Sequence, residues 1–156
     1  MKTTYRVLAY LIAAEVVVQA AALAFAFAGL THWVQGGGVL DSAAIDGSTD
    51  PFPEVAGLLV HGINGSIVVP ALALLLLLCS FFAGVPRGVR WAGAVLLLVV
   101  VQVMLGFSAP DLPALGALHG VNALALFTTA FLTARRARAR TAARTAVDPA
   151  PSAAEV

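Results

Sequence analysis

The chain has few charged residues and a single cysteine. Of its 156 residues, 11% are charged and 60% are hydrophobic, and the mean hydropathy is +0.94. A soluble globule of this size needs more polar surface, so the composition excludes that class and predicts an integral membrane protein. Cys79 has no partner for an intramolecular disulfide, and the sequence lacks a Gly-rich phosphate loop, a cysteine cluster and a nucleophile elbow.

Four long apolar runs occupy most of the chain. Each is close to the roughly 20 residues that a helix needs to cross a bilayer. They lie at about residues 5–30, 55–83, 91–107 and 112–134. We therefore predict an all-α fold, an antiparallel four-helix transmembrane bundle over residues 1–134. Residues 135–156 alternate Arg with Ala and then turn to Pro, Ala and Ser, so we expect a disordered basic tail.

The basic residues predict the orientation of the bundle. If the chain crosses the membrane four times, all of them lie on one side: Lys2, Arg6, Arg87, Arg90, Arg135, Arg136, Arg138, Arg140 and Arg144. The positive-inside rule makes that side the cytoplasm, so we expect both termini inside a bacterial cell membrane. The tail arginines favour contact with anionic lipid over nucleic acid. The first run exceeds a signal core in length and carries Glu15 and Gln19, so we expect it to be retained.

Two short motifs occur twice. The segment from His61 to Gly65 reads HGING, and the segment from His119 to Ala123 reads HGVNA. The sequence VVVQ likewise ends at Gln19 in the first run and at Gln102 in the third. These matches predict a duplicated helical hairpin, a glutamine helix followed by a histidine helix, although a valine run can also recur by chance. The glutamines are 83 residues apart and the histidines 58, which places an insertion between the first two helices.

A matched pair of histidines in membrane helices indicates a cofactor. Hydrocarbon offers a ring nitrogen nothing to bond with, so such groups usually face a bundle interior. His61 and His119 each lie about 10 Å into spans that run in the same direction, so we expect them at similar depth. Alternate helices of an up-down bundle have axes roughly 12 to 14 Å apart. Two imidazoles that reach inward across this diagonal leave room for an iron, and we predict that both ligate haem b.

Other residues share the predicted interior face. Asn64, Gly65, Asn122 and Ala123 follow the histidines by three and four positions. Small residues lie beside the histidines, either to leave space for a flat macrocycle or to let the helices pack closely. They are Gly62, Gly65, Gly120 and Ala123. Gln102 lies at the depth of the histidines and is a candidate donor to a histidine, a propionate or a quinone, or an interhelical bond. Gln19 is expected slightly deeper.

Three further residues have two interpretations each. Glu15 lies near the middle of the first span, where it either pairs with a neighbouring helix or belongs to a proton path or quinol site. Pro70 removes a backbone hydrogen bond and should bend the second span below its histidine. His32 is expected in the outer loop, either solvated or as a lid over a cofactor.

The pattern of four helices with single histidines in the second and fourth resembles one half of the haem A synthase fold, itself a duplicated four-helix bundle. The likeness covers most of residues 5–134, and the resemblance implies that His61 and His119 are axial haem ligands. The chain departs from that family in having no second half and no outer cysteine pair, and in placing Glu54 seven residues before His61. It is also similar to small uncharacterised four-helix membrane proteins of actinobacteria.

The sequence therefore predicts a small b-type cytochrome that binds one haem, for electron transfer or haem handling. A redox protein or a quinone is the expected partner besides lipid. If the chain is an enzyme, the resemblance implies an oxidoreductase related to haem A synthase. Two alternatives stay open: a cofactor-free accessory subunit whose polar residues bond helix to helix, and a quinone- or lipid-binding bundle lined by Gln19, Gln102 and Glu15. The outer face has no Lys or Arg to meet haem propionates.

Overall fold

The computed structural model describes residues 1–45 and 52–147, and in these ranges it is helical, without strands. The main helices are α1 (Lys2–Gln35), α3 (Ala56–Ile63), α4 (Val69–Ser80), α5 (Gly88–Ser108) and α6 (Pro113–Val147). A short helix α2 (Ser42–Ile45) lies in the first connection. The 3-10 turn η1 (Pro53–Val55) and the π turn η2 (Asn64–Val68) join α3 and α4 into one continuous second span.

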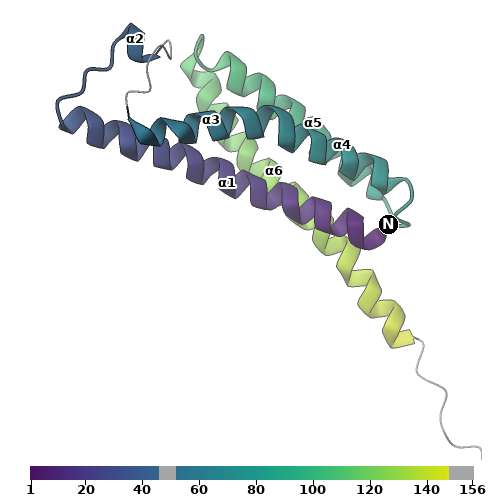
Figure 1. The fold of residues 1–156 in the computed structure, drawn as a ribbon. Helices are drawn as coiled ribbons and strands as arrows, with labels where there is room; N and C mark the ends of the chain where they lie inside the picture. The colour runs from purple at the N-terminus through teal and green to yellow at the C-terminus, as the bar shows by residue number, and fades with distance from the viewer. Residues whose placement is uncertain (46–51, 148–156) are drawn as a thin grey trace, which may run out of the picture.

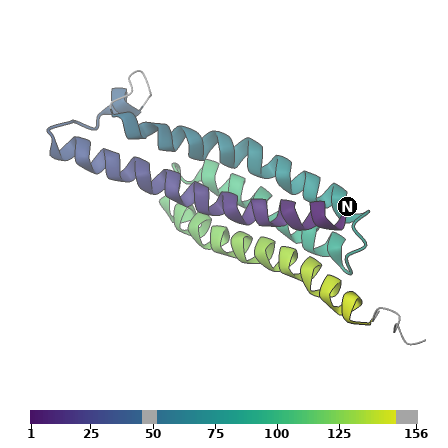
Figure 2. The ribbon, with the colours of Figure 1, turned by 60° about the horizontal axis from the view of Figure 1, so that its bottom comes forward.

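Four helices are long and apolar enough to cross a membrane, as predicted. The shortest, α5, has 21 residues, about 32 Å at 1.5 Å per residue, which matches a hydrocarbon core about 30 Å thick. The chain runs up and down, so that α1 packs against α3, α4 and α6, and α5 packs against α4 and α6 (Figures 1 and 2). The second span and α6 therefore lie across one diagonal of the bundle, and α1 and α5 lie across the other.

The two ends of the bundle differ in charge. The N-terminus, the connection from α4 to α5 and the continuation of α6 lie together at one end, which we call the basic end (Figure 1). The opposite end holds Asp41, Glu54 and Asp111 and is called the acidic end. Tyr5 Oη donates to the carbonyl of Gly88 at 3.0 Å at the basic end, and the Arg136 guanidinium lies 4.2 Å from the ring centre of Trp91.

The packed core occupies the basic half of the bundle. Small side chains dominate it and let the helices approach closely, as is common in membrane proteins. The buried residues of this cluster are Tyr5, Ala9, Ile12, Ala13, Val69, Ala73, Leu76, Ala83, Ala92, Val95, Val99, Leu126, Ala130, Ala134 and Ala137. In the second span and α6 they follow His61 and His119 toward the basic end. On α1 and α5 they lie on the basic side of Gln19 and Gln102. The acidic half is consequently less filled, and the candidate site lies there.

The second span is irregular beside Pro70, where it forms the π turn. Proline has no N–H, so the carbonyl of Ser66 loses its usual donor, and the ring would crowd that carbonyl in a regular α-helix. The wider turn over Asn64–Val68 relieves this contact. The Ser66 hydroxyl donates to the carbonyl of Gly62 at 2.6 Å. The irregular backbone thus begins three residues after His61, and the described part of α6 has no such turn.

Two predicted boundaries are wrong. The first helix continues to Gln35, so His32 and Trp33 lie in its last turns and not in a loop. The last helix continues past Ala134 to Val147, so the disorder predicted from Arg135 does not begin there; residues 148–156 lie outside the described residues. Alanine and arginine are strong helix formers, and extending an existing helix needs no new nucleus. The other span ends differ from the predicted ones by one to three residues.

Close approach of α1 and α3 depends on glycine. A Cβ at Gly57 would lie 2.3 Å from the carbonyl oxygen of Ala22, a distance that real Cβ atoms do not reach. We expect Gly57→Ala to push the two helices apart and to lower the free energy of unfolding by about 1–3 kcal/mol. Thermal unfolding in detergent, followed by circular dichroism, measures this loss.

The matched control is Gly93→Ala. Gly93 also lies in a membrane helix, but a Cβ there would meet no atom within 4 Å. We expect this variant to unfold like the wild type. Equal stability of both variants would contradict the assigned packing of α1 on α3.

Candidate functional site

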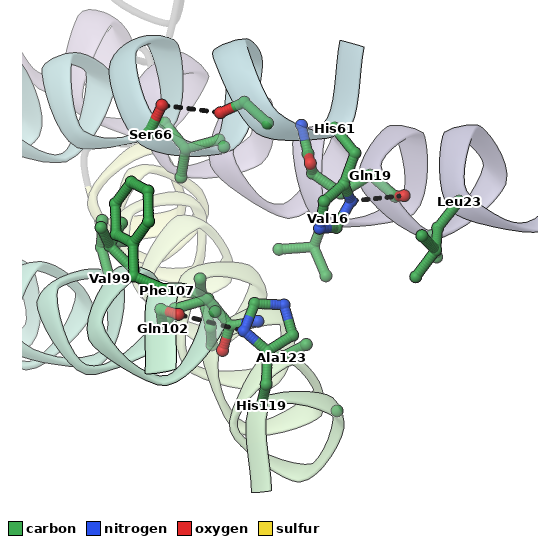
Figure 3. Close-up of a pocket in the computed structure, with 18 of the residues that line it drawn as sticks. Val16, Gln19, Leu23, His61, Ser66, Val99, Gln102, Phe107, His119 and Ala123 are labelled. Atoms are coloured by element: carbon green, nitrogen blue, oxygen red, sulfur yellow. Dashed lines mark hydrogen bonds between the residues drawn. The ribbon is translucent and has the colours of Figure 1, made fainter. Parts of the chain in front are cut away.

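The structure brings His61 and His119 together. His61 extends from α3 and His119 from α6, and their ring centroids are 6.0 Å apart with 55° between the ring planes. The two imidazoles reach toward each other from opposite sides of a pocket (Figure 3). The predicted meeting of the two histidines across a diagonal of the bundle is therefore present in the fold.

A backbone carbonyl of the neighbouring helix holds each imidazole. His61 Nδ1 lies 3.2 Å from the carbonyl oxygen of Gln19, and His119 Nδ1 lies 3.0 Å from that of Gln102 (Figure 3). A carbonyl oxygen has a second lone pair beside the one used in its helix, and it can only accept. A nitrogen that bonds to it must therefore carry the hydrogen. In a neutral ring this leaves Nε2 with a free lone pair, the arrangement common to metal-ligating histidines.

In the second hairpin, side-chain amides complete the contacts. Asn122 Nδ2 donates to Gln102 Oε1 at 2.6 Å and to the carbonyl of Leu98 at 2.9 Å. The Gln102 side chain thus bonds an asparagine, while its backbone carbonyl bonds His119. Of the roles predicted for Gln102, interhelical bonding is the one that the structure shows.

The first hairpin repeats this pattern with one addition. With its amide oxygen facing donors, Gln19 accepts from Asn64 Nδ2 at 2.9 Å and donates to the carbonyl of His61 at 2.9 Å. Asn64 Nδ2 also donates to Glu15 Oε2 at 2.5 Å. The Gln19 amide nitrogen lies 3.0 Å from His61 Nδ1, so His61 has a partner for either tautomer. Gln19, which was expected slightly deeper than the histidines, contacts His61 directly.

The pocket has a volume of about 420 Å³ and an apolar lining. All four spanning helices contribute, and Val69, Val99 and Leu126 also belong to the packed core. Its polar lining residues include Gln19, Gln102 and the two histidines. A volume of this size lies within the range of small-molecule and cofactor sites, about 300–1,000 Å³.

The small residues beside the histidines serve two purposes. A Cβ at Gly62 or Gly120 would meet no atom within 4 Å, so both glycines leave open space where they line the pocket. A Cβ at Gly65 would lie 3.2 Å from the end of the Gln19 side-chain amide, so that glycine serves close packing. Ala123 lines the pocket as expected.

Sequence reasoning missed Gly106. A Cβ there would lie 3.2 Å from Cε1 and 3.3 Å from Nδ1 of His119, so the glycine makes room for the imidazole. Gly106 follows Gln102 by four residues and therefore shares its face of α5. That spacing is the signal that could have identified it.

The third histidine lies elsewhere. His32 lines a separate hollow at the acidic end with Trp33, Phe52 and Glu54, and it is absent from the lining of the histidine pocket. The predicted lid role therefore has no support in the described residues. Among these residues, no group of three or more His, Cys, Asp or Glu side chains could hold a metal ion. A metal at His61 and His119 would need most of its ligands from another molecule.

Comparison of the chain with protein-family models, with curated proteins and with solved structures gives no match. The functional argument consequently rests on the site alone.

The contact between His119 and Gln102 predicts a defined tautomer. Because Nδ1 faces a carbonyl oxygen, we expect the neutral His119 ring to carry its hydrogen on Nδ1. Nitrogen NMR of histidine-labelled protein in detergent distinguishes this form from the Nε2–H form.

His32 is the internal control, since it is exposed and should show the ordinary mixture of tautomers. Gly106→Ala should shift the His119 resonances and leave those of His32 in place. A neutral His119 with its hydrogen on Nε2 would refute the assigned contact.

Proposed function

We propose that the chain is a small membrane b-type cytochrome that binds one haem through His61 and His119, for electron transfer or haem handling. The observation that carries this proposal is the approach of the two imidazoles to 6.0 Å between ring centroids inside an apolar pocket.

The separation suits a single iron between two imidazoles. A metal lies about 2 Å from a histidine nitrogen, and the ring centre lies about 1 Å farther on. Two such ligands on opposite sides of one iron place the ring centroids about 6 Å apart. The same separation also lies within the range of about 4.5–7 Å that ordinary ring pairs adopt, so it leaves room for an iron but does not by itself require one.

The donor set also fits haem. The two histidines supply two nitrogens, and the macrocycle supplies the other four ligands of a six-coordinate iron. The Gln102 carbonyl faces Nδ1 of His119, which would fix the orientation of that ring and strengthen its Nε2 as a ligand. His61 Nδ1 lies beside the Gln19 carbonyl and can direct its hydrogen there when Nε2 binds the iron. Haem held by His61 and His119 would supply one-electron transfer.

The pocket offers space and apolar surroundings for a flat ligand. Gly62 and Gly120 keep the region next to the histidines clear, while Val69, Val99 and Leu126 close the pocket toward the packed core. The described lining residues include no Lys or Arg. Haem carboxylates would therefore depend on water at the acidic end.

The surroundings of the site are a lipid bilayer, as the four apolar helices indicate. The proposal includes a bacterial cell membrane with both termini in the cytoplasm, which the positions of the basic residues favour. A quinone or a redox protein is then the expected electron partner.

The proposal predicts the visible spectrum of the purified protein. We expect a sharp Soret band and, after reduction, distinct α and β bands. His61→Ala and His119→Ala should each lose at least nine tenths of this absorbance, because either change removes an axial ligand. Haem content per protein, measured after extraction, checks the loss.

His32→Ala is the matched control and should keep the full spectrum, since His32 lies outside the pocket. Colourless wild-type protein from haem-replete cells that also binds no added haem would reject the proposal. That outcome would favour a cofactor-free bundle whose polar residues join its helices.

Filling the open space should also weaken binding. We expect Gly62→Leu and Gly120→Leu to lower haem affinity by about tenfold or more, because the new side chains project into the space that the glycines leave. Titration of the apoprotein with haem measures the affinity. Gly93→Leu, on α5 outside the pocket, serves as the control; equal affinities for all three variants would contradict the assigned pocket.

A further inference from the structure

Glu15 is the unexplained polar residue of the bundle. It is half-buried and lies in the middle of α1. In the central part of the described spans, no other Asp, Glu, Lys or Arg occurs. An ionisable group at this depth is costly and usually has a function. Its carboxyl oxygen Oε2 accepts from Asn64 Nδ2 at 2.5 Å.

The second hairpin shows that helix pairing does not need this carboxylate. Glu15 precedes Gln19 by four residues, and Leu98 precedes Gln102 by the same number. Asn122 donates to the backbone carbonyl of Leu98 at 2.9 Å, so an asparagine in this position is satisfied by the main chain. The glutamine, asparagine and histidine of the second hairpin make their contacts without an acid. The carboxyl group of Glu15 is therefore not needed to join the helices of the first hairpin.

Contacts lead from the carboxyl group to one histidine. Glu15 bonds Asn64, Asn64 bonds the Gln19 amide, and that amide bonds the His61 backbone. Asn64 is also three residues from His61 on the same helix, so the carboxyl group lies within about 10 Å of the space between the imidazoles.

Other titratable groups near Glu15 are few. The second span presents His61, and α6 presents His119. On α1 itself, Tyr10 and Arg6 lie toward the basic end, and Gln19 is neutral. Among the described residues, Glu54, Asp111, Arg90, Arg135 and Arg136 lie near the ends of the bundle. A charge change between the histidines consequently acts on Glu15 with little compensation from fixed charges.

We propose that proton binding by Glu15 is coupled to the charge of the centre between His61 and His119: Glu15 takes up a proton in a fraction of the molecules when the centre gains one electron, and it releases that proton when the electron leaves. This inference rests on the proposed haem site. The reductant is a membrane quinol, or dithionite in the test, and it supplies the electron that reduces ferric to ferrous iron. In these molecules the proton comes from water and converts the Glu15 carboxylate to the carboxylic acid, which balances the charge of the added electron.

The size of the coupling follows from Coulomb's law. At a separation of about 10 Å and an effective dielectric constant of about 20, one unit charge changes the proton affinity of a carboxylate by about tenfold. A tenfold change corresponds to about 59 mV in a one-electron midpoint potential. Because the added electron favours the protonated acid, the midpoint potential should fall as pH rises.

The test is a redox titration of the purified haem protein at several pH values. We expect the wild-type potential to fall by about 59 mV more than that of Glu15→Gln between its acid and alkaline limits, a tenfold coupling. Glu15→Leu, which copies the second hairpin, should match Glu15→Gln. Haem carboxylates titrate alike in all three proteins and cancel in the comparison. The matched control Leu98→Gln, at the equivalent position of the other hairpin, should keep the wild-type pH dependence.

A second readout needs no variant. Infrared difference spectra between the oxidised and reduced wild type should show a carboxylic acid C=O band on reduction, and labelling glutamate with carbon-13 should shift it. Haem binding with the same pH dependence in wild type and Glu15→Gln, and no such band, would overturn this inference alone. Absence of haem from the protein would overturn both it and the proposed function.

Discussion

The requirement that polar groups in hydrocarbon find partners governs the acidic half of the bundle. A buried amide or imidazole without a hydrogen bond costs several kcal/mol in a medium that cannot solvate it. The chain meets this cost by pairing each histidine helix with the glutamine helix that precedes it. Side-chain amides bond one another, and helix carbonyls receive the imidazole N–H groups. The same contacts that join the helices therefore set the direction of both rings.

The duplicated hairpin explains the pairing, and the differences between its copies show where the halves have specialised. His61 and His119 have equivalent carbonyl partners on equivalent helices. The first copy alone carries Glu15 and Pro70, and its π turn begins within the histidine motif, at Asn64. One side of the pocket is thus an amide network in regular helix, and the other side includes an acid and irregular backbone.

Much of this arrangement could be predicted from residue types. Hydropathy gives the four spans, and the repeated motifs indicate which two helices bring histidines to one depth. The partners of Nδ1 could not be predicted, because a backbone carbonyl carries no residue-specific signal. The separate purposes of Gly62 and Gly65 also depend on how closely α1 approaches the second span. The helical continuation past Ala134 was missed because the composition of the tail outweighed the strong helix propensity of Ala and Arg.

The separation of the packed core from the pocket bears on biogenesis. The alanine-rich half of the bundle buries its side chains without any contribution from a ligand, and Val69, Val99 and Leu126 form a floor shared by both regions. If haem binds as proposed, the polypeptide would insert and assemble first and receive the cofactor afterwards. Such an order would let the membrane hold a stock of ready apoprotein, and cofactor supply, rather than translation, would then set the amount of working protein.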